Sequence, residues 1–404
     1  MPSIWKEQGQ VIVGDAANDS LGTSVALSAD ANTLVVGAPG FLEGKEGYVR
    51  VYQREDIGGN MTQLGQTMYG EAVGDIFGYS VDITADGKIL AIGSPGIEST
   101  NGTRPGYVRV YKLDELGSSW NQLGQNISGE VIGNKFGYSV SLSDDGKTLA
   151  VGALGYVRIY RLGDDGSSWE QLGQDNDGEA HFENGEFPVS LSANGTTVAI
   201  GAPWNSDNGE RSGHVKVYQI DNEGSSWKLL GQIISGEVNY GYFGWFVDVS
   251  ADGKKLAIGS AGYKSGQPAF VRVYSLESSD DSFIWKQLGE DITTAASGDE
   301  FGSFDVEFGS SGSLSVDGKT LAVGASLSDG SGGVKAGHVS VYRMDDSSSS
   351  WLQHGEDIDD EAAGDHSQFV SISLSADGKT VAIGSYGNGD KVVNSGHVRV
   401  FAME

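Results

Sequence analysis

One pattern of short alternating segments recurs seven times along the chain, and this repeat limits the possible fold more than any other feature. Each copy contains a Trp-x-Gln-Leu-Gly-Gln anchor or a variant of it. The anchors start at Trp5, Met61, Trp120, Trp169, Trp227, Trp285 and Trp351, which are 49 to 66 residues apart. We expect these tryptophans to pack in the core or at the edge of each repeated unit, because their apolar area is large.

The plainest copy runs from Phe136 to Tyr160 and contains three segments with a period of two. These segments are Ser139–Ser143, Thr148–Gly152 and Tyr156–Tyr160. A period of two predicts β-strands. Asp145-Gly146 between the first two segments predicts a tight primed turn with positive φ at both central residues. The copy is therefore predicted to be an antiparallel meander, and the segment from Trp169 onward supplies a fourth strand.

Seven copies of four strands predict an all-β, seven-bladed β-propeller with four antiparallel strands per blade, formed by residues 1–404 as a single unit. The two ends of the chain fit this prediction. Residues 4–13 have the pattern of an outer strand, whereas the last copy, at 366–401, stops after its third strand. We expect the N-terminal strand to complete the last blade and close the ring, because this pairing leaves no open sheet edge.

The spacing of Phe-Gly and Val-Gly-Ala-Pro elements resembles the FG-GAP repeat. It occurs as Phe77-Gly78 with Ile92-Gly93-Ser94-Pro95, and again at Val36-Gly37-Ala38-Pro39. The segment Ile358–Asp365 is similar to the non-animal branch of that family. FG-GAP repeats build the seven-bladed head of integrin α chains and occur in bacterial and algal surface or secreted proteins. The resemblance implies a binding surface and an extracellular or cell-surface location.

Many FG-GAP repeats also bind calcium between their first and second strands through an Asp-x-Asp-x-Asp-Gly run. The corresponding turns here keep one acid followed by lysine, as in Asp86-Gly87-Lys88 and Asp252-Gly253-Lys254. Calcium prefers several oxygen ligands, and a nearby lysine opposes a divalent ion. We therefore expect plain hairpin turns and no cofactor, with calcium as the disfavoured alternative.

The charge and composition exclude several classes of partner. The formal charge is −29, from 55 acidic and 26 basic residues, so a phosphate backbone would be repelled. No apolar run approaches about 18 residues, so we expect no membrane insertion. Cysteine is absent, which excludes thiolate chemistry and disulfides. The first ten residues do not resemble a signal peptide, and we interpret the sequence as a mature or excised part of a longer precursor.

No catalytic residues are predicted. His214, His338 and His397 occupy a position that other copies fill with tyrosine, as at Tyr107, which indicates an architectural role. No Gly-x-Ser-x-Gly, His-Glu-x-x-His or phosphate-loop motif is present. We predict no metal ligands.

Candidate binding residues lie in the loops that vary between copies and in the acidic loops before each first strand, which share one rim of a propeller. Trp204 differs from the anchor tryptophans because it lies in a long polar loop, where it could stack on a sugar or peptide, or fold back over its own blade. The candidates are Trp204, Asn205, Asp207, Arg211, Arg104, Tyr263, Tyr386, Glu71, Asp75, Glu130 and Asp365. The acids could bind cations or basic ligands, or only cap turns.

Three functions remain open. The leading hypothesis is a non-enzymatic extracellular recognition or adhesion propeller that binds a protein or glycan through its variable-loop rim. The first alternative is a polysaccharide hydrolase or lyase with rim carboxylates as acid and base. The second is a structural spacer of a larger surface protein. We expect a monomer or a part of a larger chain, and the plain copy at 136–160 is expected to contribute least to binding.

Overall fold

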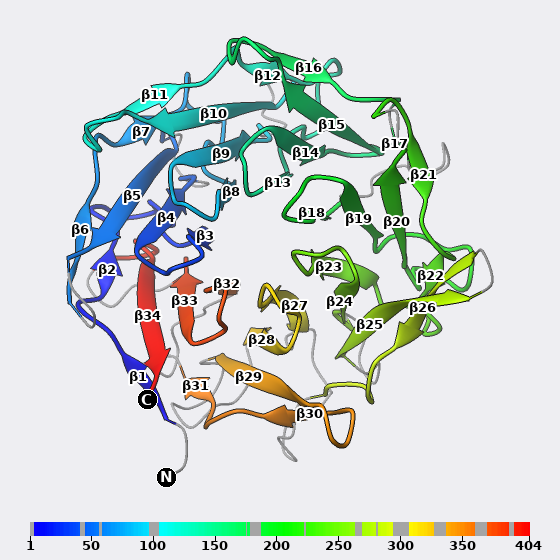
Figure 1. Cartoon of the computed structure of the whole chain (residues 1–404). Helices are drawn as coiled ribbons and strands as arrows, with labels where there is room; N and C mark the ends of the chain where they lie inside the picture. Colours follow the sequence, from blue (N-terminus) through cyan, green and yellow to red (C-terminus); the bar gives the residue numbers. More distant parts are fainter. Residues whose placement is uncertain are drawn as a thin grey trace.

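A computed structural model describes most of the chain: residues 4–40, 45–55, 59–96, 105–174, 176–177, 187–221, 224–262, 269–279, 282–293, 307–326, 337–359, 370–387 and 392–404. The described residues contain strands and no helix. Their strands form seven sheets around a central axis (Figure 1), so the predicted all-β, seven-bladed propeller is confirmed.

Each blade is an antiparallel meander whose outermost strand is split into two short segments in all blades but the fifth. Blade one contains β3 (Ser24–Leu27), β4 (Thr33–Ala38), β5 (Tyr48–Arg54), β6 (Met61–Gln63) and β7 (Met68–Tyr69). Blade two contains β8 (Ser80–Ile83), β9 (Ile89–Ser94), β10 (Tyr107–Leu113), β11 (Trp120–Gln122) and β12 (Ile127–Ser128). Blade three contains β13 (Ser139–Leu142), β14 (Thr148–Gly152), β15 (Tyr156–Leu162), β16 (Trp169–Gln171) and β17 (Asn176–Asp177).

The remaining blades repeat this order. Blade four contains β18 (Val189–Leu191), β19 (Thr197–Ala202), β20 (His214–Ile220), β21 (Trp227–Leu229) and β22 (Ile234–Ser235). Blade five contains β23 (Phe243–Val249), β24 (Lys255–Ser260), β25 (Phe270–Ser279) and β26 (Ser282–Gln287). Blade six contains β27 (Glu307–Leu314), β28 (Thr320–Ser326), β29 (His338–Asp345), β30 (Ser350–Gln353) and β31 (Ile358–Asp359).

Blade seven is built from both ends of the chain. Its inner strands are β32 (Val370–Leu374), β33 (Thr380–Ser385) and β34 (His397–Met403). The N-terminal strands β1 (Trp5–Glu7) and β2 (Ile12–Val13) both pair antiparallel with β34. The two ends of the chain therefore lie side by side (Figure 1), and the predicted ring closure by the N-terminal strand is confirmed.

The turns between first and second strands differ from the predicted primed type. Gly146 has a φ of 65°, but Asp145 is not among the residues with positive φ. The Gly146 N–H donates to the Ser143 carbonyl (2.9 Å), and the Ser143 N–H donates to the Thr148 carbonyl (2.9 Å). The loop is thus a longer turn that ends in one left-handed glycine. The prediction of positive φ at both central residues was wrong because the strand pairing stops one residue earlier on each side.

The anchor tryptophans connect neighbouring blades. Each indole N–H donates to a backbone carbonyl of the preceding blade at 2.8 to 3.1 Å. The pairs are Trp120–Leu64, Trp169–Leu123, Trp227–Leu172, Trp285–Leu230, Trp351–Leu288 and Trp5–His354. The predicted edge packing is therefore correct, and it includes a directional bond between blades that the sequence pattern did not indicate.

The Leu-Gly-Gln segment explains why the outer strand is interrupted. Gly65 has a φ of 75°, and a Cβ placed on it would lie 2.9 Å from Cδ1 of Trp120. The adjacent Gln66 side chain accepts from the Trp120 N–H (3.0 Å) and donates to the Trp120 carbonyl (2.6 Å). The strand breaks at this glycine so that the indole of the next blade can lie against it.

The hydrophobic core consists of seven clusters, one at each junction between adjacent blades. The innermost strands add polar links. For example, Ser373 Oγ accepts from the Leu27 N–H (3.0 Å), and Ser141 Oγ accepts from the Leu191 N–H (3.0 Å). A blade therefore completes its buried surface and its hydrogen bonds only through its neighbours.

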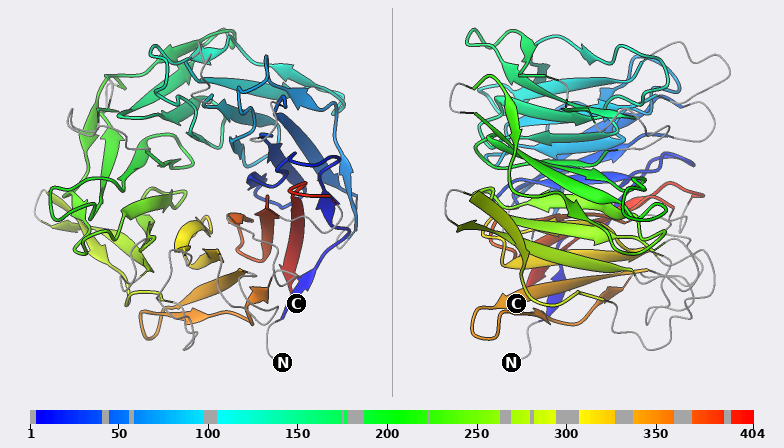
Figure 2. Two further views of the ribbon diagram at one scale, coloured as in Figure 1. Left: turned by 180° about the vertical axis from the view of Figure 1, so that it is seen from behind. Right: turned by 90° about the vertical axis from the view of Figure 1, so that its right-hand side faces the viewer.

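The strands end at two opposite rims, which are visible edge-on in Figure 2. On one rim, here called the turn rim, backbone bonds such as Ala193 N–H to the Ala251 carbonyl (3.1 Å) join successive Asp-Gly turns. On the other, the loop rim, the loop before a first strand contacts the loop between second and third strands. The Tyr240 N–H, for instance, donates to the Glu210 carbonyl (2.7 Å). The acidic and the variable loops therefore share one rim, as predicted.

We predict that Trp285→Phe lowers the free energy of unfolding by about 1–3 kcal/mol, because the buried Leu230 carbonyl loses its indole donor. Denaturant unfolding followed by circular dichroism measures the change. Trp204→Phe is the matched control, since its indole N–H has no hydrogen-bond partner among the described residues. Equal effects of the two substitutions would contradict a stabilising role for the bond between blades.

Candidate functional site

An aromatic cluster lies on the loop rim at the junction of blades four and five. It is formed by loop 203–213, between β19 and β20, by loop 236–242, between β22 and β23, and by the start of β23. The Trp204 ring contacts Tyr242 edge-on, with ring centres 5.1 Å apart, and lies 6.1 Å from the Trp245 ring. The Tyr242 and Trp245 rings are perpendicular at 6.0 Å. Tyr242 is buried, whereas Trp204 and Trp245 are half-buried.

Arg211 lies at the exposed edge of this cluster. Its guanidinium lies over the Trp204 ring at 5.3 Å and over the Tyr240 ring at 6.0 Å. One nitrogen, Nη1, donates to the Tyr242 hydroxyl at 3.1 Å, and this bond raises the pKa of Arg211. The side chain forms no ion pair with any described residue, so it is a charged group with free N–H donors at the rim.

The other polar residues of loop 203–213 shape the loop. Asn205 is buried at 2% exposure, donates to Asp207 Oδ2 (3.0 Å) and accepts from the Asp207 N–H (2.9 Å). The Gly213 N–H donates to the Asn205 carbonyl (2.9 Å). The structure thus brings the predicted residues Trp204, Asn205, Asp207 and Arg211 together in one ordered loop.

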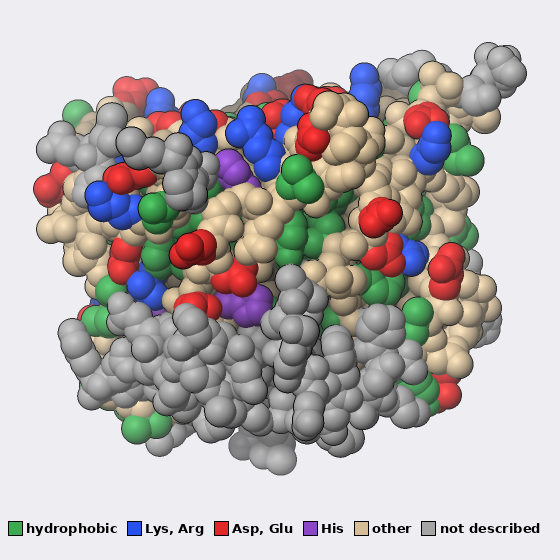
Figure 3. Space-filling model, turned by 90° about the horizontal axis from the view of Figure 1, so that it is seen from below, with side chains coloured by type: hydrophobic (Ala, Val, Ile, Leu, Met, Phe, Trp, Pro, Cys, Tyr) green, Lys and Arg blue, Asp and Glu red, His purple; other side chains and the backbone are tan. Residues whose placement is uncertain are grey.

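The predicted acidic residues are engaged in structural contacts. Glu71 pairs with Arg109 of the next blade (2.5 Å), and Glu130 pairs with Arg158 of the next blade (3.0 Å). Asp75 is buried and accepts from the N–H groups of Glu71 (3.0 Å) and Ala72 (2.9 Å). Figure 3 shows acidic and basic side chains interspersed on the outer wall, in line with such pairing.

Of the remaining predicted site residues, only Tyr386 lies among the described residues, and it lies in another blade. Tyr386 follows β33 in blade seven and is half-buried. Arg104, Tyr263 and Asp365 lie outside the described residues. The prediction that the loop rim carries binding residues therefore stays a prediction for these positions.

Sequence reasoning missed Tyr240, Tyr242 and Trp245 as site residues. Tyr240 and Tyr242 add aromatic residues where blade two has Gly74 and Ile76 and blade three has Gly133 and Lys135. Trp245 instead stands where these blades have Tyr79 and Tyr138. This local excess of aromatic residues could have marked the segment 239–246 as a candidate binding loop. Nothing in the sequence, however, indicated that these residues would contact Trp204, because 36 residues separate Trp204 from Tyr240.

Two aspartates line the inner wall of the ring. Asp82, on β8, accepts from the N–H groups of Leu142 (2.6 Å) and Ile83 (2.8 Å). Asp248, on β23, accepts from the Leu314 N–H (2.7 Å) and the Ser190 hydroxyl (3.0 Å). Desolvation raises the pKa of Asp82 to about 7, with a further rise from the charge of Asp248. Desolvation also raises the pKa of Asp248 to about 6.

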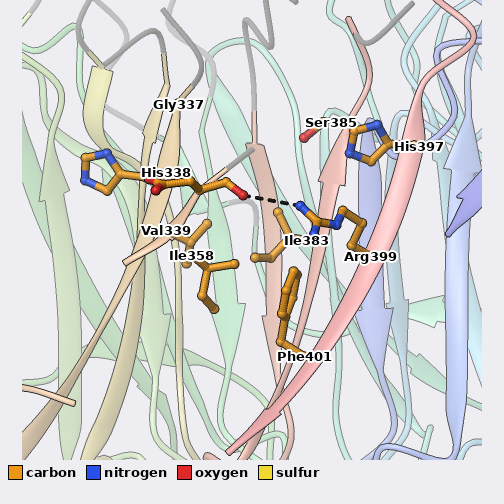
Figure 4. Close-up of a pocket in the computed structure, with 10 residues that line it drawn as sticks. Gly337, His338, Val339, Ile358, Ile383, Ser385, His397, Arg399 and Phe401 are labelled. Atoms are coloured by element: carbon orange, nitrogen blue, oxygen red, sulfur yellow. Dashed lines mark hydrogen bonds between the residues drawn. The ribbon is translucent and has the colours of Figure 1, made fainter. Parts of the chain in front are cut away.

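A pocket of about 290 Å³, open to solvent, lies between blades six and seven. Figure 4 shows His338 and His397 at its edges and Arg399 donating to the Asp359 carbonyl (3.2 Å). Between blades one and two, the buried Phe77 occupies the equivalent space. The pocket lining therefore corresponds to a packing slot for the residue before a first strand, and here the residues preceding β32 lie outside the described ranges.

The described residues lack two further features. No group of three or more His, Asp or Glu side chains is arranged there to hold a metal ion. The same residues include no helix that is long and apolar enough to cross a membrane.

Comparison with known proteins supports the fold and leaves the function open. No protein-family model and no curated protein sequence matches the chain. The structure is similar to the Pseudomonas aeruginosa periplasmic gluconolactonase PpgL, with a TM-score of 0.58 and 16% identity over 97% of this chain and 91% of that one. It is also similar to the β-propeller domain of Myceliophteria thermophila Cps50 (Swd1), with a TM-score of 0.59 and 10% identity over 99% of both chains.

A third similar structure is the C-terminal WD40 domain of Sif2, with a TM-score of 0.52 and 13% identity over 100% of this chain and 99% of that one. At these identities the likeness shows the fold alone. The neighbours include an enzyme and a WD40 domain, so the propeller fold does not decide whether this chain is an enzyme.

We predict that Asp248→Asn changes how stability depends on pH. In the folded chain the pKa of Asp248 is raised from 3.8 to about 6, so protonation of Asp248 favours the folded state over the unfolded state. This contribution to the free energy of unfolding is lost as the pH rises from about 4 through 6. Asparagine can still accept from the Leu314 N–H and can donate to Ser190. Between pH 4 and pH 8, the free energy of unfolding of the variant should therefore rise by up to about 3 kcal/mol relative to that of the native chain.

Urea unfolding at a series of pH values tests this prediction. Asp221→Asn is the control, because hydrogen bonds from Ser226 and Ser225 lower the pKa of the half-buried Asp221 to about 2, outside that pH range. Its stability curve should run parallel to that of the native chain from pH 4 to pH 8. A parallel curve for Asp248→Asn as well would show that Asp248 does not titrate in this range.

Proposed function

We propose that this chain is a non-enzymatic recognition propeller of the FG-GAP type that acts outside the cell and binds a protein or glycan through its loop rim. One observation carries the proposal: Trp204, Tyr240, Tyr242, Trp245 and Arg211 cluster at one junction of that rim. Aromatic residues with a cationic partner on well-ordered loops are typical of ligand-binding surfaces.

The enzyme alternative has weaker support. One structural neighbour is a gluconolactonase, but that likeness extends to the fold only. The rim acids Glu71 and Glu130 form ion pairs with Arg109 and Arg158 at two different blade junctions. A glycosidase instead needs two carboxyl groups that flank a single bond of the substrate. These contacts favour a structural role for both acids.

The proposed activity needs no cofactor. In the turns where related repeats would bind calcium, each aspartate caps its own turn: Asp86 Oδ1 accepts from the Lys88 N–H (3.0 Å) and the Thr84 hydroxyl (2.7 Å).

We further propose that the protein acts as a monomer or as part of a larger chain. A spacer domain would need none of the rim aromatic residues.

A glycan array combined with a screen of extracellular proteins tests the proposal. Trp245→Ala should weaken binding at least about tenfold, as expected for loss of a central aromatic contact. Phe283→Ala is the matched control, because Phe283 is an exposed aromatic residue of the same blade near the turn rim. Polysaccharide turnover that is abolished by Glu71→Gln or Glu130→Gln would contradict the proposal, and so would binding that neither aromatic substitution changes.

A further inference from the structure

Arg211 differs from the arginines that are the third residue of β5, β10, β15, β25 and β34. Those side chains pair with carboxylates: Arg50 with Asp15, Arg109 with Glu71, Arg158 with Glu130, Arg272 with Asp291 and Arg399 with Glu7. Arg211 forms no ion pair with a described residue, although the chain has 55 acidic and only 26 basic residues. Its position against Trp204 and Tyr240 therefore needs another explanation.

The backbone beneath Tyr240 is unusual for a large side chain. Tyr240 stands three residues before the buried Phe243 and has a φ of 59°. The residues at the same position before Phe77 and Phe136 are Gly74 and Gly133, with φ values of 87° and 85°. The left-handed region disfavours large side chains sterically, so tyrosine strains a position that glycine fills elsewhere.

Arg211 is placed in the same way. It stands two residues before Gly213 with a φ of 49°, and the corresponding residue of blade seven is Asn394, with a φ of 51°. Asparagine tolerates this conformation better than arginine does. Two neighbouring loops thus carry large side chains on left-handed backbone, at Tyr240 and at Arg211.

The loop of blade five also lacks a stabilising cap. Gly241 stands where blade two has Asp75, whose Oδ2 accepts from two backbone N–H groups and from the Tyr107 hydroxyl (3.0 Å). Glycine cannot accept these bonds. The fold does not require a strained backbone or a loop without a carboxylate cap at this junction. Such features are typical of sites under functional constraint.

The exposed chemistry of this cluster limits the ligand. A planar guanidinium with free N–H donors matches a carboxylate in a two-point hydrogen bond. Aromatic rings beside it suit the apolar face of a sugar ring. The formal charge of −29 opposes long polyanions, so a ligand with few charges is favoured.

We propose that the junction of blades four and five binds an acidic saccharide, whose carboxylate pairs with Arg211 while its ring lies against Tyr240 and Trp245. This inference rests on the proposed recognition function and names its ligand class. Arg211 provides the charge, and the left-handed backbone at 211 and 240 holds the guanidinium and the tyrosine ring on the same side of the junction.

Matched pairs of saccharides test the inference on the whole chain. We would compare glucuronides with glucosides and galacturonides with galactosides, by array and then by calorimetry. The native chain should bind the acidic member at least tenfold more tightly. Arg211→Gln should abolish this preference, and Arg211→Lys should retain part of it because the charge remains. Arg343→Gln, near the turn rim, should leave binding unchanged.

The other possible results separate the acidic-saccharide inference from the proposed recognition function. Binding of neutral saccharides that depends on Trp245 but not on Arg211 would overturn the carboxylate inference and leave the recognition function intact. Binding of an extracellular protein with no saccharide binding would do the same. Absence of binding to any saccharide or protein would overturn both.

A stability measurement separates a binding role of Tyr240 from a structural one. Because glycine relieves the strain at φ 59°, Tyr240→Gly should raise the thermal unfolding midpoint while it weakens binding of the acidic saccharide at least fivefold. Asn394→Gly, which also replaces a left-handed residue by glycine but lies in blade seven, should leave binding unchanged. A lower midpoint for Tyr240→Gly, or unchanged binding, would show that Tyr240 serves the fold alone.

Discussion

Contact between neighbouring blades is the constraint on which the whole structure depends. All seven hydrophobic clusters lie between sheets, and the indole N–H of an anchor tryptophan crosses six of the junctions to a carbonyl of the preceding blade. At the junction that closes the ring, Met61 replaces tryptophan, and the bond from Gln10 to the Met61 carbonyl (2.7 Å) remains, as Gln66 bonds to the Trp120 carbonyl. No blade can bury its surface alone, so pairing of β1 and β2 with β34 completes the first and last blades together.

Such a ring leaves the loops free to change, because the strands, the turn rim and the tryptophans already fix the position of every blade. Blades two and three keep the repeat's glycines and their Arg–Glu pairs. The junction of blades four and five departs from these blades at Tyr240, where they have glycine, and at Gly241, where blade two has Asp75. We therefore propose that function lies where the sequence departs from the rules that the other blades obey.

Much of the fold could be predicted from the sequence because the repeat shows each strand seven times. The shape of the Asp145-Gly146 turn and the bond from each indole could not, since both depend on where strand pairing stops and on the neighbouring blade. The site was predicted in part. Trp204 and Arg211 were named as candidates because their loop is long and polar, whereas Glu71 was grouped with them because its partner, Arg109, belongs to the next repeat. Contacts between repeats are not visible in a single copy.

The central claim is that loops 203–213 and 236–242 form the ligand site. Hydrogen–deuterium exchange of the whole chain, with and without a saturating acidic saccharide, tests it most directly, because it reports every described loop in one experiment. The account predicts slower exchange in these two loops and unchanged exchange at the turn rim and in the loops of blades two and three. Protection centred on the turn rim, or on the loops around Glu71 and Glu130, would contradict it.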